Sequence, residues 1–480
     1  MKRKIQTAFL IFPNSLFPGV KFECDKIFVL EEPLFFKPKN YQISKIKLAY
    51  HRATLKYYFD QLDHPEKEYV EYAKVGNYES ISEYEITYYD TMDKELEAKI
   101  KAAFPNSRAL ESPLFLLTRR ECLNYFGKEK KRFVQQHFFE YVKGKMGVLR
   151  NVASHDGENR NPLPKNHSFK FKLPSFDTSY HMEAQGYINS HPEFQAHLGD
   201  ITQVVRYPIS QEQAEQHFNE FLDNKVINFG PYEDAIDKKE SILFHSFISV
   251  PLNVGILSPK WVLDAIMART NIPMNSLEGY VRQLIGWREY MRGLYVSFDL
   301  QGSNHFSHKG KLNWDYWNGN KPTGIPILDN EIKKVMKLGY CHHIPRLCIF
   351  LNIFNLLEIE LEQVVKWFSQ FVCMDAYPWV MYSNIAAMGY YDTRFMQKPY
   401  LTASAYLLKM SDYEKGPWCD IWNALFYRFL HAHKGDLKGG ASVYLRNLAH
   451  FEKKNEMEQS KILKTAENFI NKVTEKYFFF

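Results

Sequence analysis

The first 130 residues alternate short apolar runs with amphipathic segments, and this alternation restricts the fold more than any other feature of the sequence. The runs TAFLIF, KIFVLEE, YEITYYD and SPLFLLT are bounded by turn residues, which is typical of buried parallel strands. Between them, residues 44–62 and 93–104 repeat apolar side chains every three or four positions, as amphipathic helices do. The pattern predicts an α/β domain with a parallel sheet over residues 1–130.

The composition and periodicity of the sequence change twice after residue 130. Residues 131–206 include HDGENRNPLPKNHSFKFKLPSFD, which is rich in Asn, Pro and charge and has little periodicity, so we expect a long inter-domain linker. From 207 to 480, helical periods dominate, as in ISQEQAEQHFNEFLDNKV and LEQVVKWFSQFVCMDAY. The sequence therefore predicts an all-α C-terminal domain.

Charge, cysteine content and hydropathy limit the class of protein. A net charge of +6 over 480 residues is compatible with a polyanionic partner but is no argument for one. The six cysteines lack the close pairing of a disulfide framework, which indicates reduced thiols of an intracellular protein. No apolar stretch reaches the ~18 residues that a membrane span requires. We expect a soluble, intracellular monomer without a membrane partner.

The segment SLEGYVRQLIGWREYMRGLY (276–295) mixes charged, polar and aromatic residues. At roughly 100° per residue, its charged side chains form one stripe: Glu278, Arg282, Glu289 and Arg292. A solvated row of ion pairs explains that stripe, but it does not explain Gln283 and Trp287 on the opposite side, which should be apolar. A pocket for a planar ligand with hydrogen-bonding edges accounts for both residues.

Two further segments carry side chains that could bind a ligand or take part in catalysis. In LFHSFISVPLNVGIL, four side chains offer donors to a phosphate or ribityl chain, although a capped helix–helix turn is an equally good interpretation: His245, Ser246, Ser249 and Asn253. The stretch GYCHHIPRLC (339–348) crowds two Cys, two His and an Arg together. Its spacing differs from the paired ligands of zinc sites. A catalytic or a purely structural role therefore outweighs a metal site.

These segments stand in an order that resembles the photolyase–cryptochrome superfamily, and within it the bacterial-type photolyase-related branch. The other matching motifs are VLEEPLFF, KIKLAYHRATLKYY, GVLRN, ENRNPLP, HHIPRL, DAYPWV and KPYLTASAYLLKMSDY, and the most specific is EGYVRQLIGWREYMRG. The resemblance covers nearly the whole chain. It implies an N-terminal α/β antenna domain, a long linker and a C-terminal helical domain that holds FAD.

The resemblance also implies site residues. Those expected to bind FAD are His245, Ser246, Ser249, Leu252, Asn253, Gln283, Arg288, Asp375, Ala376 and Asn384. Those expected to act on the substrate are Glu278, Trp287, His342 and His343, and those expected to contact DNA are Arg346, Lys398 and Tyr400. Trp367 and Trp379 are the expected electron carriers, and Glu31 and Glu32 mark the place of an antenna chromophore, for which the lumazine type is one option.

The implied activity is light-driven repair of UV-damaged DNA, in which electron transfer from photoexcited reduced FAD splits pyrimidine dimers. The adjacent histidines favour the (6-4) photoproduct, whose repair needs a proton donor, and leave the cyclobutane dimer open. A cryptochrome-like blue-light photoreceptor is the alternative.

One departure from the family concerns cysteine. Most of the branch carries a four-iron cluster on four cysteines, three of them after the MSDY motif. Here EKGPWCD follows MSDY directly, so only Cys419 stands near an expected position. Since such clusters need four thiolates, the sequence predicts no iron–sulfur cluster and no other metal, and a C-terminal half held by packing alone.

Overall fold

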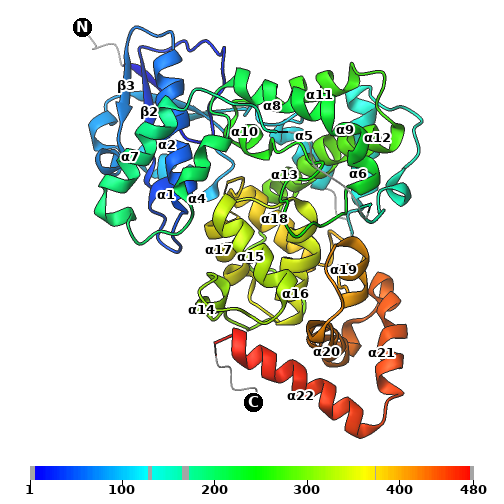
Figure 1. Ribbon diagram of the computed structural model, residues 1–480. Helices are drawn as coiled ribbons and strands as arrows, with labels where there is room; N and C mark the ends of the chain where they lie inside the picture. Colours follow the sequence, from blue (N-terminus) through cyan, green and yellow to red (C-terminus); the bar gives the residue numbers. More distant parts are fainter. Residues whose placement is uncertain (1–5, 128–131, 165–171, 373, 476–480) are drawn as a thin grey trace.

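The computed structural model describes residues 6–127, 132–164, 172–372 and 374–475. A five-stranded parallel sheet with the strand order β3-β2-β1-β4-β5 lies in the N-terminal part of the chain (Figure 1). The strands are β1 (Thr7–Ile11), β2 (Lys26–Leu30), β3 (Lys67–Val70), β4 (Glu85–Tyr89) and β5 (Arg108–Leu110). The predicted parallel α/β domain is confirmed, although β3 had no signal in the sequence analysis.

Helices flank this sheet, and polar side chains fix where they begin. Helix α2 (Lys45–Gln61) starts after Ser44, whose hydroxyl accepts a hydrogen bond from the backbone N–H of Ile46. Helix α4 (Lys94–Ala103) starts after Asp93, whose carboxylate accepts from two backbone N–H groups. The shorter helices here are α1 (Pro33–Phe36), α3 (Tyr72–Val75) and α5 (Arg119–Phe126).

The segment SPLFLLT (112–118) is not the strand that its apolar run predicts. Strand β5 lies just before it, and 112–118 forms turns. The buried carboxylate of Glu289 accepts the backbone N–H groups of Leu116 and Leu117 at 3.0 and 3.1 Å. A distant side chain therefore satisfies N–H groups that a strand would give to a neighbouring strand.

The remainder of the chain is helical, as predicted. The helices in this region are α8 (Gln211–Asn224), α9 (Val226–Tyr232), α10 (Ser249–Val254), α11 (Pro259–Met267), α12 (Met274–Val281), α13 (Arg288–Ser297), α14 (Trp314–Trp317), α15 (Pro326–Leu338), α16 (Asn352–Leu356), α17 (Leu361–Phe371), α18 (Pro378–Met388), α19 (Ser404–Met410), α20 (Pro417–Ala432), α21 (Leu445–Glu452) and α22 (Glu456–Val473). Arg282–Trp287 and Pro345–Leu351 are π-helical. Within the described residues, no helix combines the length and the apolar character that crossing a membrane requires.

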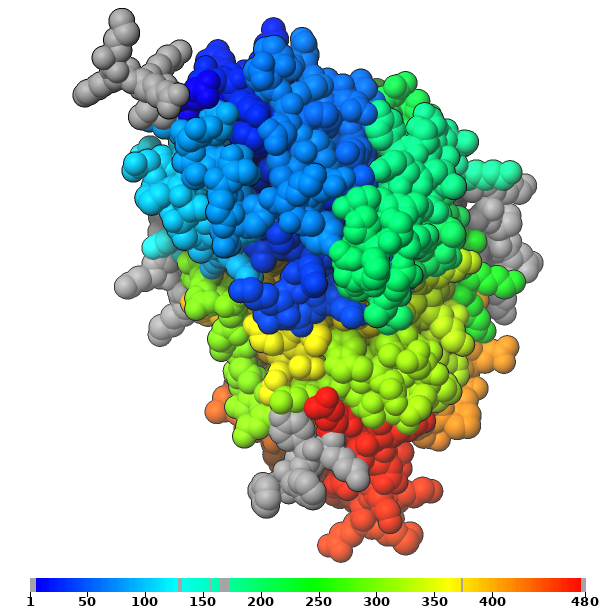
Figure 2. All heavy atoms as spheres, turned by 90° about the vertical axis from the view of Figure 1, so that its left-hand side faces the viewer, coloured from blue at the N-terminus to red at the C-terminus, as the bar shows by residue number. Residues whose placement is uncertain are grey.

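Two α-helices in the described part of the expected linker, 131–206, pack on different parts of the molecule. Helix α6 (Gln135–Met146) packs against the π-helical segment Arg282–Trp287, whereas α7 (Ser179–Ser190) packs on α2 beside the sheet. Figure 2 shows the blue-green segment that includes α7 along one side of the blue N-terminal domain. The expected boundary at 130/131 lies outside the described residues.

The two domains also touch directly through α2. The ammonium group of Lys47 donates to the carbonyl oxygen of Ala376, and His51 Nε2 lies 3.1 Å from the hydroxyl of Tyr377. Burial, together with the nearby charge of Lys47, lowers the pKa of His51 well below its ordinary value. The DAYPWV motif is thus supported from behind by the α/β domain.

Packing alone does not hold the C-terminal half, so that expectation is wrong. Glu358, in the turn after α16, lies 2.7 Å from Arg428 on α20 and 2.6 Å from Nε2 of His433 at the end of α20. These ion pairs join the turn to α20. Although burial of the carboxyl opposes it, the hydrogen bond from His433 and the charge of Arg428 lower the pKa of Glu358 to about 2. Folding is therefore coupled to the ionisation of this carboxyl.

We expect Glu358→Gln to lower the free energy of unfolding by about 2 kcal/mol at pH 7, because Arg428 loses its counter-charge. A depressed carboxyl pKa stabilises the fold above its unfolded value of about 4.3, and this contribution is lost as the pH falls toward 2. Urea denaturation at several pH values should show the difference from wild type shrinking below pH ~4. Glu467→Gln, on the exposed face of α22, is the matched control; a difference independent of pH would contradict the assignment.

Candidate functional site

A cavity of about 670 Å³ lies within the helical part of the chain. Its wall includes parts of α10, α18, both π-helical segments and the connector around Asn159. The predicted residues that line it are His245, Ser246, Ser249, Leu252, Asn253, Gln283, Trp287, Arg288, His342, His343, Arg346, Asp375, Trp379, Asn384, Lys398 and Tyr400. The volume is in the range of a pocket for a large organic ligand.

Five predicted residues do not line this cavity. Buried Glu278 lies elsewhere: its carboxylate accepts from Arg282 at 2.5 Å and from the backbone N–H of His155 at 3.3 Å. Trp367 lies behind the cavity-lining Phe368, at a ring distance of 5.2 Å. The others are Ala376, whose carbonyl faces Lys47, and Glu31 and Glu32 of the N-terminal domain.

A π-helical segment carries Gln283 and Trp287, which line the cavity, whereas Glu278, Glu289 and Arg292 of the charged stripe do not. A π-helix bonds each N–H to the carbonyl five residues earlier, so it widens the helix by one residue per turn. Arg282–Trp287 adopts this form between α12 and α13. The charged stripe is not a solvated row of ion pairs either, because Glu278, Glu289 and Arg292 are at most 1% exposed.

Several hydrogen bonds fix the polar wall of the cavity. Asp375 holds Arg346 through two bonds of 3.0 and 2.9 Å. Asn253 bridges to both sides, since its amide donates to the carbonyl of Asp375 at 3.0 Å and its oxygen accepts from Arg288 at 3.2 Å. The indole N–H of Trp287 donates to Asn384 at 2.9 Å. These side chains are thus pre-oriented.

Five buried polar atoms of the cavity residues have no hydrogen-bond partner within the described ranges: Asn159 Oδ1, His245 Nε2, Ser249 Oγ, Arg288 Nε and His342 Nδ1. Buried polar groups are nearly always paired with protein, water or ligand. The cavity is therefore suited to a polar ligand with several acceptors and donors. The residues expected to bind FAD fit such a group.

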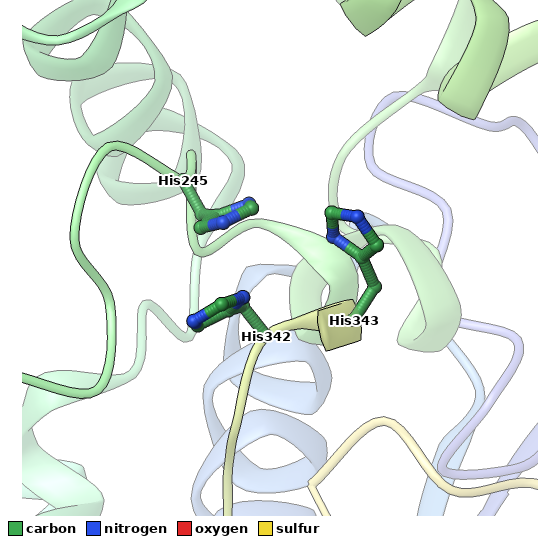
Figure 3. Close-up of side chains that lie close together, drawn as sticks. All are labelled: His245, His342 and His343. Carbon is green, nitrogen blue, oxygen red and sulfur yellow. The ribbon is translucent and has the colours of Figure 1, made fainter. Parts of the chain in front are cut away.

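Three histidines that line the cavity lie close together, as Figure 3 shows. The rings of His245 and His342 stack at 4.2 Å with 18° between their planes, and His343 lies at 5.3 Å from His245 and nearly perpendicular to it. Burial lowers the pKa of both His245 and His342 well below the ordinary value. These two rings are therefore neutral at pH 7.

His343 has different surroundings. Its side chain is 38% exposed, and its Nε2 lies 3.7 Å from Glu233 and 3.8 Å from Asp234. Burial raises the pKa of Glu233, and the charge of His343 opposes that rise. An imidazolium at His343 would thus face two counter-charges.

The histidine cluster also tests the prediction that the chain binds no metal. One nitrogen from each ring lies within 4.8 Å of the others. A metal ion binds in the plane of an imidazole, and the stacked rings of His245 and His342 direct their lone pairs side by side instead of toward one point. This geometry is poor for a common ion, and the absence of a metal stays a prediction.

Glu31 and Glu32, the expected antenna residues, are fully buried and engaged by their own domain. Glu31 accepts from Arg52 at 2.8 Å and from Tyr69 at 2.6 Å. Glu32 accepts from Lys99 at 2.7 Å and from the hydroxyl of Tyr78. The carboxylates already support this domain, so nothing here points to a ligand for them.

The sequence analysis missed several residues of the site. Glu233 and Asn159 line the cavity, and the only signal for Asn159 was the ENRNPLP motif around it. Cys341 and Cys348, which resemble ordinary buried thiols in the sequence, line the cavity too. Burial raises the pKa of Cys341 to about 12, so this thiol stays protonated.

Comparisons with known proteins agree with this architecture. Residues 9–205 match the family model of deoxyribodipyrimidine photo-lyase-related protein. A (6-4) photolyase of Agrobacterium fabrum is 29% identical over 365 residues, which are 68% of this chain and 67% of that protein.

Two solved structures share the fold over almost their whole length. A bacterial class III photolyase from Agrobacterium tumefaciens superposes with a TM-score of 0.57 and 14% identity, covering 98% of this chain and 99% of its own. A cryptochrome from Synechocystis sp. PCC6803 gives 0.56 and 12%, again covering 98% of this chain and 99% of its own. At these low sequence identities, the similarity to the two structures shows only the fold.

The neutral histidines predict how stability depends on pH. His245 and His342 have pKa values below the unfolded value of about 6.5, so the unfolded chain binds more protons and stability falls as the pH drops below 6.5. We expect His342→Gln to reduce the slope of unfolding free energy against pH by about 1.4 kcal/mol per unit between pH 6.5 and 5. Denaturant titrations measure this slope, and exposed His450→Gln is the control. An unchanged slope in His342→Gln would refute the neutral state.

Proposed function

Because this chain belongs to the photolyase–cryptochrome superfamily, we propose that it is a DNA photolyase that uses light to split UV-induced pyrimidine dimers, with the (6-4) photoproduct as the favoured lesion. The observation that carries the proposal is the cavity in which two neutral histidines and the more exposed His343 join the residues expected to bind FAD. A similar protein, from Agrobacterium fabrum, is a (6-4) photolyase.

A blue-light photoreceptor is the second candidate, because a cryptochrome shares the fold. The two candidates differ in what they require of the cavity. Repair needs a proton donor and a place for an extruded lesion, whereas signalling needs neither. His343, which is partly exposed at the cavity, favours repair.

FAD would be held by the polar wall of the cavity. Ser249, His245 and Arg288 offer the unpartnered atoms that a phosphate or ribityl chain would engage, and the Arg346–Asp375 pair lies on the same wall. When bound and reduced, FAD supplies the electron under blue light. The protein residues bind and orient both ligands, exclude water and provide the proton.

We propose His343 as the proton donor and assign a positioning role to His342. A general acid must carry a proton at working pH and must reach its substrate. His342 is held neutral by burial and stacks on His245, whereas His343 is more exposed and faces the carboxylates of Glu233 and Asp234.

The DNA contacts that we propose involve the exposed Lys398 and half-buried Tyr400 at the cavity wall. A lysine there suits a backbone phosphate, and an aromatic ring suits a base. Arg346 is committed to Asp375 through two hydrogen bonds, so we assign it to ligand orientation. Extrusion of a damaged base into the pocket costs less than extrusion of a paired one.

We further propose that electrons reach the cavity through Trp367. The Trp367 ring lies 5.2 Å from Phe368 of the cavity wall and 6.4 Å from the Trp317 ring, and its indole N–H donates to the Trp317 carbonyl at 2.8 Å. The sequence analysis did not select Trp317. Trp379 lines the cavity directly and is the other expected carrier.

The proposed cofactor set leaves out an iron–sulfur cluster. Among the described residues, Cys419 lies on α20 and does not line the cavity, whereas Cys341 and Cys348 do. Cys373 lies outside the described residues. No antenna chromophore is included in the proposal, since Glu31 and Glu32 are already engaged.

The repair test uses purified protein whose bound FAD has been reduced. This protein is mixed with DNA that carries a single cyclobutane dimer or a single (6-4) lesion and is illuminated with blue light. We expect restoration of the (6-4) lesion, and its loss in His343→Ala, because the proton donor is missing. His305→Ala, outside the cavity wall, is the control. Absence of repair of either lesion by FAD-loaded wild type would refute the enzyme and favour the photoreceptor.

Replacing Trp367 tests the electron route. Phe is a poor carrier of an electron hole, so we expect Trp367→Phe to slow light-dependent reduction of the bound flavin while leaving FAD content unchanged. Flavin absorbance under blue light with an external reductant measures the rate. Trp261→Phe on α11 is the control, and a wild-type rate in Trp367→Phe would exclude this route.

A further inference from the structure

Three consecutive buried residues, Asp375, Ala376 and Tyr377, connect the cavity wall to the α/β domain. They form the turn before α18, and Pro378 begins that helix. A segment outside helices and strands has no hydrogen-bond ladder of its own, so its buried polar groups need partners elsewhere. In this turn the partners come from two sides, one in the cavity wall and one in the α/β domain.

On the cavity side, Asp375 holds groups that face the ligand space. Its carboxylate accepts two hydrogen bonds from Arg346, at 3.0 and 2.9 Å, and its backbone carbonyl accepts from Asn253 at 3.0 Å. Asn253 in turn accepts from Arg288 at 3.2 Å. All four residues line the cavity. The direction of the Arg346 guanidinium therefore depends on where the backbone at Asp375 lies.

On the other side, Lys47 of α2 holds the backbone of the same turn. Lys47 is 3% exposed, and its ammonium group donates to the carbonyl oxygen of Ala376. The same ammonium group lies 4.2 Å from the centre of the Tyr377 ring. A buried cation is costly unless acceptors surround it, and the carbonyl oxygen and the ring face both serve as acceptors. The docking of the two domains thus fixes the position of Ala376.

His51, one helical turn further along α2, fixes the Tyr377 side chain. Its Nδ1 lies 3.2 Å from the carbonyl oxygen of Phe35, which can only accept, so this nitrogen carries the hydrogen. Burial, together with the charge of Lys47, holds the pKa of His51 well below its ordinary value, so the ring is neutral and Nε2 is an acceptor. The Tyr377 hydroxyl, 3.1 Å away, therefore donates to Nε2.

We propose that Lys47 and His51 are positioning residues of the ligand cavity, because they hold residues 375–377 from the α/β domain and thereby keep Asp375 where it orients Arg346. The inference rests on the proposed function, since it takes FAD as the ligand at this wall. It gives the α/β domain a role in cofactor binding that requires no chromophore of its own. Without the Lys47 ammonium group the buried Ala376 carbonyl loses this donor, so the turn shifts and Arg346 loses its alignment.

A double-mutant cycle on FAD binding tests the proposal. Release of FAD from the purified holoprotein, followed by flavin fluorescence, gives the Kd of each variant. We expect Lys47→Met and Asp375→Asn each to raise the Kd about tenfold, because a buried polar group loses a partner. The double variant should bind FAD within about threefold of Asp375→Asn, because Lys47 acts through Asp375. The flavin absorption spectrum should shift in the same direction in both single variants, since both displace the Arg346 charge.

Three further variants separate positioning from general damage to the fold. Lys47→Arg keeps a charged donor, so its Kd should return to within about threefold of wild type. Lys45→Met, on the same helix but only half-buried, is the matched control and should bind FAD as wild type does. Tyr377→Phe loses only the hydroxyl that reaches His51 and should raise the Kd about threefold. Combined with Asp375→Asn, it supplies a second cycle if Lys47→Met fails to fold in urea denaturation.

The remaining outcomes have distinct meanings. If the fold-changes of the two single variants multiply in the double variant, Lys47 acts independently of Asp375 and the proposal is overturned. Wild-type affinity and an unshifted flavin spectrum in a folded Lys47→Met protein overturn it as well, while leaving the photolyase assignment intact. Failure of the wild-type protein to bind FAD refutes the proposed function itself.

Discussion

The buried charges on α13 connect the two halves of this protein. The Glu289 carboxylate accepts two backbone N–H groups of the turn after β5, while Arg288 and Arg292 donate to the carbonyl oxygens of Leu114 and Leu117 in the same turn. These groups are buried, so their desolvation cost is repaid only if all contacts form together. The helix is thereby held in one position against the α/β domain, and the cavity wall that precedes it is held with it.

The electrostatics of the cavity follow from the same burial. His245 and His342 lie deep and stacked, where low polarity keeps them neutral, whereas His343 stands nearer to solvent and faces two carboxylates. The adjacent residues His342 and His343 thus differ in exposure, one ring being buried and the other partly exposed. Glu233 belongs to both features, because it faces His343 and also holds the amides of Asn159 and Gln283.

Much of the fold was accessible from the pattern of side chains, because buried strands and amphipathic helices differ in period. The errors have physical causes. SPLFLLT is as apolar as a strand, but Glu289, far along the chain, takes its N–H groups. The solvated row of ion pairs fails as an interpretation because Glu278, Glu289 and Arg292 are buried. Glu278 was selected for its motif, yet Arg282 and the backbone of His155 hold it away from the cavity.

The sequence by itself determined the α/β domain, the helical domain and a set of polar residues that belong together, because hydrophobic period and motif order are local properties. Only the tertiary structure decided which of those residues share the cavity, which histidine is exposed, and that Asn159 of the connector reaches Glu233 beside Gly279. Burial and distance decide these points. Both arise when segments more than 70 residues apart come together, as Asn159 and Glu233 do.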